Sequence, residues 1–270
     1  MPIKFAAHPQ YAKLCCLLRF RGAAACALTF CKPVATNVMP SALLAGLFPT
    51  SVVAFEARGA VAPETLHPQE AEYVTRATPK RVREFAAGRA CARAALAQLQ
   101  IEGFPLHVGP DREPQWPGGV SGSITHTADY CGVVVARNTH LTALGVDAET
   151  RAAVRPALWR QICTAEEQAW LRQIGEAQAL EMATLIFSAK EAFFKCQFPA
   201  TRQWLNFSDV SVSVEANAFW VHPRARLRLE SLLPAPWRGR FALQDELVVT
   251  GICIAADTTR AGGGASAPIL

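Results

Sequence analysis

Two helical segments, each accompanied by short strands, constrain the fold of this chain more than any other feature. The first opens with Thr78 as N-cap and Pro79 at the first helical position, which is a helix start signal. Its apolar residues recur at helical spacing and predict one buried stripe, formed by Val82, Phe85, Ala86, Ala92, Leu96 and Leu99. A capping box of Thr164 and Glu167 opens a later helix, and residues 180–194 form another.

Short apolar or alternating runs predict strands around these helices. They lie at residues 51–55, 132–136, 142–147, 210–214 and 219–221, with a hairpin-like pair over 241–255. Residues 109–122 contain several Pro and Gly and are expected to form a loop that leads into residues 123–126. The sequence therefore predicts an α/β (α+β) protein of two similar small lobes, each a few-stranded, largely antiparallel sheet packed on a long helix.

The turn at Asn138 places the predicted boundary between the lobes near residue 140. We expect an N-terminal lobe over residues 39–140 and a C-terminal lobe over residues 141–257. Residues 261–269 are mainly Gly, Ala, Ser and Pro, and residues 258–270 are predicted to be disordered. Residues 1–38 are interpreted as a leader without a stable fold, with Met39 as the hypothesised true start of the chain.

The charge distribution argues against a nucleic-acid-binding protein. Five of the 27 basic residues lie in residues 1–38, where there is no acidic residue, so 22 basic residues face 22 acidic ones in the rest of the chain. A nucleic-acid binder more often spreads Lys and Arg across its folded part. The folded part is thus expected to be neutral and to have no nucleic-acid partner.

The cysteines and the uncharged segment near the N-terminus bear on the compartment. The nine cysteines are odd in number, dispersed and without a CxxC pair, which favours reduced thiols in the cytoplasm over a disulfide scaffold. Residues 33–55 carry no charge and are long enough to cross a bilayer. Pro33, Pro40 and Pro49 interrupt them, so we predict no membrane span.

Several common catalytic and nucleotide-binding motifs are missing from the sequence. No GxGxxG follows a predicted strand and no GxxxxGK[ST] occurs, which argues against dinucleotide and P-loop chemistry. Ser123 lies in Ser-Gly-Ser and lacks the GxSxG pattern of a serine nucleophile elbow.

Carboxylates at two places suggest a metal site instead. Asp147 and Glu149 are two residues apart on a predicted strand, so they point to the same side and can bind one ion. Glu191 on the later helix would supply a third carboxylate, and Mg²⁺ needs few such ligands beside water and phosphate oxygens. Lys190 and Lys195 flank Glu191, and cations beside a metal suggest a phosphate-bearing substrate.

Each of these features also has a simpler interpretation. Glu191 and Lys195 could be a surface pair at i and i+4, and Asp147 and Glu149 could be solvated at a strand end. Arg89 and Arg93, on a face away from the apolar stripe, could be solvated. His126 could be a satisfied polar residue at a junction between loop and strand, and Arg112 could be a turn residue.

Five sequence blocks in a fixed order nevertheless resemble one family. They cover residues 83–96, 114–117, 122–126, 145–149 and 187–195, and read REFAAGRACARAAL, PQWP, GSITH, GVDAE and FSAKEAFFK. Together they resemble the 4'-phosphopantetheinyl transferases of the enterobactin-synthetase component D and surfactin-synthetase-activating type. The resemblance extends over most of residues 47–211.

This resemblance implies an enzyme that transfers the 4'-phosphopantetheine arm of coenzyme A to a serine of an apo acyl or peptidyl carrier protein, releasing 3',5'-ADP. It implies an active site between the lobes and Mg²⁺ held by Asp147, Glu149 and Glu191. It also implies Glu191 as the base for the serine hydroxyl and Lys195 as the group that stabilises the departing phosphate. Such enzymes are usually monomers and serve fatty-acid, polyketide, nonribosomal-peptide or siderophore synthesis.

The same resemblance implies a set of residues that contact coenzyme A. They are Arg89, Arg93, Arg112, Thr125, His126, Lys190 and Lys195. Lys80, Arg81 and Arg83 are candidates for a basic patch that would attract an acidic carrier protein. Two alternatives remain, namely a coenzyme A or nucleotide-binding protein without transfer activity and a Mg²⁺-dependent phosphohydrolase.

Overall fold

The computed structural model describes residues 37–127, 129–231 and 235–256. Two antiparallel sheets have the strand orders β1-β2-β6-β5 and β7-β11-β10-β9-β8. The first contains β1 (Val38–Pro40), β2 (Val53–Arg58), β5 (Val120–Thr127) and β6 (Tyr130–Arg137). The second contains β7 (Leu141–Thr150), β8 (Val210–Glu215), β9 (Ala218–Pro223), β10 (Trp237–Gln244) and β11 (Leu247–Ala255). A separate pair joins β3 (His107–Val108) and β4 (Pro114–Gln115).

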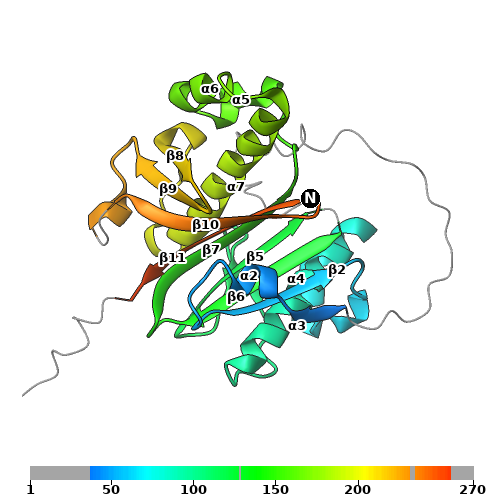
Figure 1. Cartoon of the computed structure of the whole chain (residues 1–270). Coiled ribbons are helices and arrows are strands. Elements are labelled where there is room, and N and C mark those ends of the chain that lie inside the picture. The colour runs from blue at the N-terminus through cyan, green and yellow to red at the C-terminus, as the bar shows by residue number, and fades with distance from the viewer. Residues whose placement is uncertain (1–36, 128, 232–234, 257–270) are drawn as a thin grey trace, which may run out of the picture.

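One long helix covers each sheet. Helix α4 (Pro79–Gln98) packs on the first sheet and α7 (Glu176–Thr201) packs on the second (Figure 1). The shorter helices are α2 (Ala42–Ala45), α3 (Pro68–Ala71), α5 (Pro156–Ile162) and α6 (Ala165–Leu171). Single 3₁₀ turns are η1 (Pro63–Thr65), η2 (Glu72–Val74), η3 (Phe207–Asp209) and η4 (Arg228–Ser231). The predicted α+β fold of two antiparallel lobes is confirmed.

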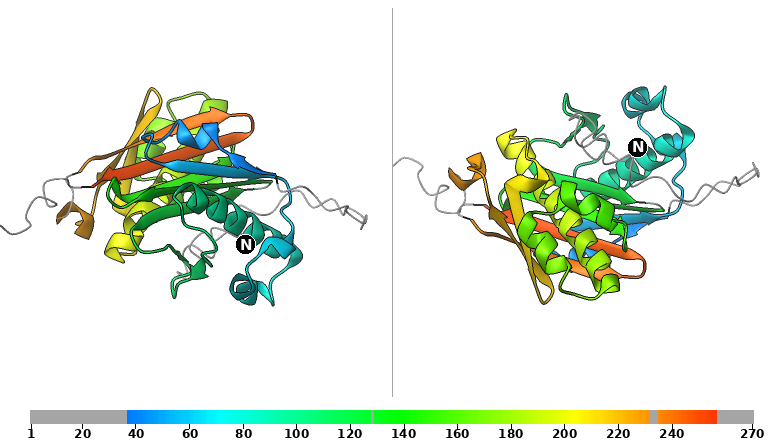
Figure 2. Two further views of the ribbon diagram at one scale, coloured as in Figure 1. Left: turned by 90° about the horizontal axis from the view of Figure 1, so that it is seen from below. Right: turned by 90° about the horizontal axis from the view of Figure 1, so that it is seen from above.

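The two sheets pack face to face between the two long helices, as the three views together show (Figures 1 and 2). Strand β6 explains this order, because its side chains alternate between two apolar layers. Val133 and Val135 pack toward α4, whereas Val134 packs with Val146 and Val249 of the second sheet. Helix α7 closes the second sheet from the other side in the largest apolar cluster.

A seam between β5 and β7 joins the two lobes. Ser123 Oγ accepts from the backbone N of Val146 at 3.1 Å, and Thr125 Oγ1 accepts from the backbone N of Ala148 at 2.9 Å. The bonded positions advance by two residues along both strands, from Ser123 to Thr125 in β5 and from Val146 to Ala148 in β7. The two strands therefore run side by side in the same direction. Side chains rather than backbone carbonyls make these bonds across the seam.

The local start signals are confirmed, but several elements extend beyond their predicted ends. Thr78 Oγ1 accepts from the backbone N of Arg81, and Thr164 forms a reciprocal capping box with Glu167. Strand β5 begins at Val120, inside the expected loop, because its backbone pairs with β6 from that residue onward. His126 therefore lies within a strand rather than at its entrance. Helix α7 is longer than predicted at both ends.

The ends of the chain lie largely outside the described residues. Val38, assigned to the leader, pairs with Ala57 in the first sheet, whereas the predictions for residues 1–36 and 258–270 fall on residues that are not described. None of the helices in the described part of the chain is long and apolar enough to cross a membrane. The described cysteines are free thiols: Cys91, Cys131, Cys163 and Cys196 are buried, and Cys253 is half-buried.

Candidate active site at the seam between the lobes

Strand β7 carries Asp147 and Glu149 on the face of the second sheet that α7 covers. Gly145 lies on the same side, and a Cβ atom there would be only 2.0 Å from the carbonyl oxygen of Ala192 in α7. Only glycine permits this close approach, so α7 lies directly against β7 at this point. Asp147 is fully buried, and Glu149 and Glu191 are nearly so. The expected solvation of these carboxylates at a strand end is therefore not observed.

Lys195 links α7 to the seam. Its Nζ donates to Asp147 Oδ1 at 2.8 Å and to the carbonyl of Val146 at 3.0 Å. Thr125 Oγ1 donates to the same Oδ1 atom at 3.3 Å. An ammonium group has three N–H donors, so one remains beyond the two described acceptors. Lys195 thus pairs with the buried carboxylate of Asp147 within the second lobe, next to the seam.

The three predicted metal ligands lie on adjoining elements but do not form a compact metal centre. Among residues 37–127, 129–231 and 235–256, no three His, Cys, Asp or Glu side chains stand close enough together to hold a metal ion. The ammonium of Lys195 occupies the place beside Asp147 Oδ1 where a cation would bind. The chemistry of the three buried carboxylates fits Mg²⁺, since this ion prefers carboxylate oxygens.

A pocket of about 240 Å³ opens between α4 and the first sheet. Its charged or titratable lining consists of Lys80, Arg83, Glu84, His126, Asp129, Tyr130 and Cys131. His126 Nε2 lies 3.5 Å from Glu84 Oε2. Since neighbouring residues of a strand point to opposite sides, Thr125 faces β7 while His126 faces α4. The pair predicted to contact one phosphate is thus divided between the seam and the pocket.

Burial controls the protonation of the pocket histidine. It lowers the pKa of His126 from 6.5 to about 4, although the neighbouring carboxylate of Glu84 opposes this shift. Burial raises the pKa of Glu84, but the hydrogen bond and charge of His126 outweigh it and lower that pKa to about 2. At neutral pH the pair is therefore a carboxylate beside a neutral imidazole, whose Nε2–H can donate to Glu84.

Arg89 and Arg93 bond to other parts of the first lobe, Arg89 as a buried side chain and Arg93 as a partly exposed one. Arg89 is almost completely buried, and its Nε donates to the carbonyl of Leu106 at 3.0 Å. Arg93 donates to the buried Glu70 at 2.5 Å and to the carbonyl of Thr65. The expectation of a solvated helix face is wrong, because these residues from other parts of the chain cover it. Neither guanidinium appears in the lining of the pocket.

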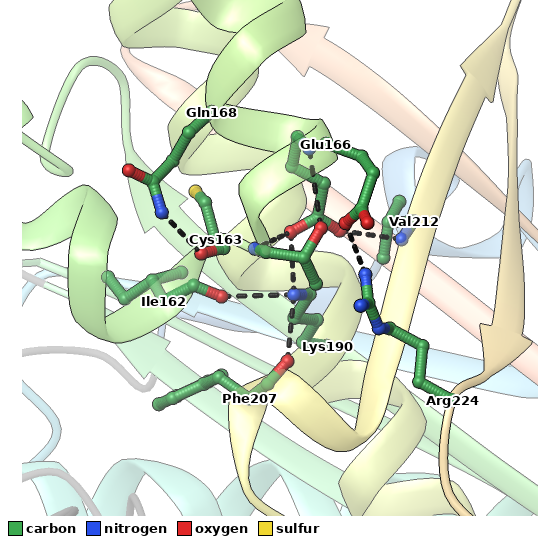
Figure 3. A network of polar contacts seen from close by, with 10 residues as sticks. Ile162, Cys163, Glu166, Gln168, Lys190, Phe207, Val212 and Arg224 are labelled. Atoms are coloured by element: carbon green, nitrogen blue, oxygen red, sulfur yellow. Dashed lines mark hydrogen bonds and ion pairs between the residues drawn. The ribbon is translucent and has the colours of Figure 1, made fainter.

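Arg112 and Lys190, two further residues predicted to contact coenzyme A, bond to other parts of the chain. Arg112 is exposed in a turn with φ 65°, and its backbone N donates to Gly109 at 2.9 Å, in agreement with the simpler interpretation. Lys190 is buried, and its ammonium donates to Ile162, Glu167 and Phe207 (Figure 3). All three of its N–H groups are therefore used within the second lobe, and none is left for a phosphate.

Glu84 is the residue of this region that the sequence did not single out. A signal for it exists in the helix spacing: Gly88 of α4 faces Ile124 of β5, where a Cβ would lie 3.3 Å from the isoleucine side chain. One helical turn earlier is Glu84, and two strand residues later is His126. Because α4 lies along β5, one step of four residues back on the helix and two residues forward on the strand bring Glu84 opposite His126.

Comparisons with known proteins match both lobes of the chain to one family. The family model described as the 4'-phosphopantetheinyl transferase N-terminal domain matches residues 69–136, and the model of the 4'-phosphopantetheinyl transferase superfamily matches residues 143–243. The chain is 37% identical over 201 residues to 4'-phosphopantetheinyl transferase Svp of Streptomyces mobaraensis, with 71% of this chain and 79% of that protein covered.

Two further relatives are similar over different lengths. The chain is 36% identical over 194 residues to 4'-phosphopantetheinyl transferase PptT of Mycobacterium tuberculosis, with 69% of this chain and 85% of that protein covered. It is 38% identical over 118 residues to enterobactin synthase component D of Escherichia coli, with 43% and 54% covered.

Proposed function

Because the chain belongs to the 4'-phosphopantetheinyl transferase superfamily, we propose that it transfers the phosphopantetheine arm of coenzyme A to a serine of an apo carrier protein. The observation that carries this proposal is the contact of Lys195 with Asp147 at the seam, beside the buried Glu149 and Glu191. Buried carboxylates with a lysine suit phosphoryl transfer, which depends on positioning and on charge stabilisation.

The proposed step forms one bond and breaks another. The serine oxygen of the carrier attacks the phosphorus that bears the pantetheine arm, and the bond from that phosphorus to the bridging pyrophosphate oxygen breaks, releasing 3',5'-ADP. Glu191 accepts the proton of the serine hydroxyl, because a serine needs a base within hydrogen-bond reach. Lys195, with its remaining N–H, donates to the departing phosphate of ADP.

We propose Mg²⁺ as the metal of this reaction because its expected ligands are carboxylates. Asp147, Glu149 and Glu191 would hold Mg²⁺, since all three are carboxylates buried beneath α7. When bound, the ion would neutralise charge on the pyrophosphate. A matched assay without Mg²⁺ tests this, and equal turnover in both samples would rule it out.

The pocket beside α4 is the proposed site for the nucleotide end of coenzyme A. Lys80 and Arg83 bring two positive charges to its lining, and His126 adds an imidazole. Coenzyme A carries a 3'-phosphate in addition to its pyrophosphate, and such cations attract it. Arg89 and Arg93 support this binding indirectly, because they anchor α4, which carries Lys80 and Arg83.

The carrier proteins are proposed by class. Acyl carrier proteins and peptidyl carrier domains of fatty-acid, polyketide, nonribosomal-peptide and siderophore synthesis are the expected clients, and a cytoplasmic monomer is the expected form. Lys80 and Arg81 at the start of α4 remain candidates for steering an acidic carrier, because Lys80 is exposed. Mutation of either residue to Gln would then slow association with the carrier at low salt, and added salt would reduce the difference from the unaltered protein.

The experiment that tests the function measures both products. Apo carrier is incubated with the protein, coenzyme A and Mg²⁺, and its intact mass is recorded together with the 3',5'-ADP released. We expect the carrier to gain one phosphopantetheine for each ADP. Release of 3',5'-ADP without carrier would indicate a phosphohydrolase, and binding of coenzyme A without either product would indicate a coenzyme A-binding protein.

A further inference from the structure

A buried polar cluster joins α7 to four other elements of the second lobe (Figure 3). At its centre the ammonium of Lys190 lies 2.8 Å from Glu167 Oε2 in α6. It also donates to the carbonyl of Ile162 at the end of α5, at 3.0 Å, and to the carbonyl of Phe207 in η3, at 2.8 Å. Both charged side chains are almost completely buried.

Glu167 extends the cluster on its other side. Its Oε2 accepts from the backbone N of Thr164 at 2.7 Å, which closes the capping box of α6. Its Oε1 accepts from the backbone N of Val212 in β8, also at 2.7 Å. The carboxylate therefore has partners from three segments, and the ion pair as a whole ties α5, α6, η3 and β8 to one residue of α7.

Directional bonds of this kind fix a helix in a way that its apolar contacts do not. The rest of α7 is packed through side chains such as Ile186, Phe193 and Phe198, and apolar packing is not directional. A helix turns by 100° and rises by about 1.5 Å per residue, so a small rotation of α7 moves every side chain that it carries. Three short bonds from one ammonium resist that rotation.

The position of Lys190 in the sequence gives this restraint a consequence. Glu191, the proposed base, directly follows Lys190, and Lys195 lies five residues after Lys190 on the same helix. On the opposite side of the helix, Gly145 allows α7 to approach β7 closely. Helix α7 is thus held between the ion pair on one side and β7 on the other.

We propose that Lys190 and Glu167 form a positioning pair, which holds α7 in the rotation that aims Glu191 and Lys195 at the seam. This inference rests on the proposed transfer function. Lys190 is a positioning residue and not a catalytic one, because its ammonium has no donor left for substrate. A displacement of about 1 Å of reacting groups can cost roughly 100-fold in rate, so the loss of this pair should reduce turnover.

A pair that only stabilised the fold would behave differently. Lys190→Met alone leaves the carboxylate of Glu167 buried without its counter-charge, so this single variant is expected to unfold at a clearly lower temperature. The double variant Lys190→Met/Glu167→Gln removes both charges together. It leaves no buried charge without its partner, so it should melt at a higher temperature than the single variant, and kinetics recorded at a temperature where it is folded report on position rather than on stability.

The experiment measures kcat and KM for coenzyme A in this double variant, with the carrier mass as the readout. We expect kcat to fall roughly 10- to 100-fold while KM for coenzyme A changes less than about 3-fold, because the proposed nucleotide pocket lies in the other lobe. The requirement for Mg²⁺ should shift to higher concentration, since Glu191 is a proposed ligand.

A neighbouring ion pair offers a matched control. Glu166 and Arg224 form a contact on the same side of α6, but both are exposed. The double variant Glu166→Gln/Arg224→Met should keep its kcat. Normal kcat in a folded Lys190→Met/Glu167→Gln variant would overturn the positioning pair. Failure of the unaltered protein to modify any carrier would instead overturn the function on which it rests.

Discussion

The two long helices differ in what their buried and partly buried cations contact. In α4, both Arg89 and Arg93 are spent on the first lobe itself, and the exposed cations of the pocket lie near the start of the helix. In α7, Lys190 bonds to α5, α6 and η3 of the second lobe, and Lys195 bonds to Asp147 of β7, the strand that borders the seam. The two arginines and Lys190 bond within their own lobes, whereas Lys195 keeps one N–H beyond its two described acceptors.

This difference suggests a division of labour between the lobes. The first lobe offers a pocket in which the exposed cations Lys80 and Arg83 stand beside two carboxylates and a neutral histidine, and these two cations are the groups that we expect to bind an anion. The second lobe offers buried carboxylates and a lysine on opposing elements, which suits the chemical step. Changes in the first lobe should therefore act mainly on KM, and changes near Lys195 mainly on kcat.

The largest expected effect belongs to Glu191. Glu191→Gln keeps the size of the side chain but removes the negative charge that the proposed base and metal ligand require. We expect kcat to fall by about 1,000-fold or more, with little change in melting temperature. Single-turnover mass spectrometry of the carrier measures the rate, and near-normal turnover would break the proposed role of the second lobe.

Arg93 provides a large effect of a different kind. Arg93→Leu leaves the buried carboxylate of Glu70 without its partner, and breaking such a pair costs about 3–5 kcal/mol. We expect a lower melting temperature in thermal unfolding, together with unchanged affinity for coenzyme A at a temperature where the variant is folded. A stable variant that no longer bound coenzyme A would show that Arg93 contacts the ligand.

The buried histidine predicts a loss of stability in mild acid. The pKa of His126 is about 4 in the folded chain and about 6.5 in the unfolded one, so the unfolded chain binds more protons between these values. Stability is therefore fully present above pH 6.5 and falls as the pH drops toward 4, by up to about 3 kcal/mol.

The variant His126→Gln should weaken that dependence. Urea unfolding at pH 7 and at pH 5 measures the difference in free energy of unfolding for both proteins. An equally steep fall in the variant would assign the acid sensitivity to other groups. The carboxylate of Glu84 loses its stabilising ionisation at lower pH, between about 4.5 and 2, so it does not confuse this range.

A smaller effect is expected at the pocket cations. Arg83→Gln removes one positive charge from the lining and should raise KM for coenzyme A by about 10-fold while kcat is kept, since a charge-assisted bond to phosphate contributes about 1.5–3 kcal/mol. With dephospho-coenzyme A, which lacks the 3'-phosphate, the variant and the unaltered protein should have equal KM. A persistent difference would place Arg83 at another part of the ligand.

Thr125 should give the smallest effect when it becomes serine. The hydroxyl of Thr125 accepts from Ala148 and donates to Asp147, and serine can make the same two bonds. We expect Thr125→Ser to keep kcat within about 2-fold, whereas Thr125→Val leaves the amide of Ala148 without its acceptor and should lower stability by about 1–3 kcal/mol. Equal behaviour of both variants would show that the hydroxyls do not hold the seam.

The sequence predicts what depends on neighbouring residues and misses what depends on distant ones. The caps at Thr78 and Thr164 were predicted because a cap bonds within three residues. Strand β5 was missed at its start because Pro and Gly precede Val120, and only pairing with β6 makes it a strand. The family-like blocks predicted site residues on β7 and α7, which pack against each other, although the spacing alone left their roles open.

Arg89, Arg93 and Lys190 show most clearly what the sequence alone does not reveal. Helical spacing identifies the apolar face of α4 but does not reveal that Thr65, Glu70 and Leu106 cover its polar face. In the same way, the acceptors of Lys190 lie 28, 23 and 17 residues away in the chain. Which cations serve the scaffold is decided by tertiary contacts, and the structure is needed to assign them.

The most direct test of this division is the initial rate of carrier modification as coenzyme A is varied, measured side by side for Arg83→Gln and Lys195→Met. The account predicts that Arg83→Gln raises KM for coenzyme A with kcat kept, and that Lys195→Met lowers kcat at least about 100-fold with KM nearly unchanged. The opposite pattern, with kcat lost at Arg83 and only KM changed at Lys195, would contradict it.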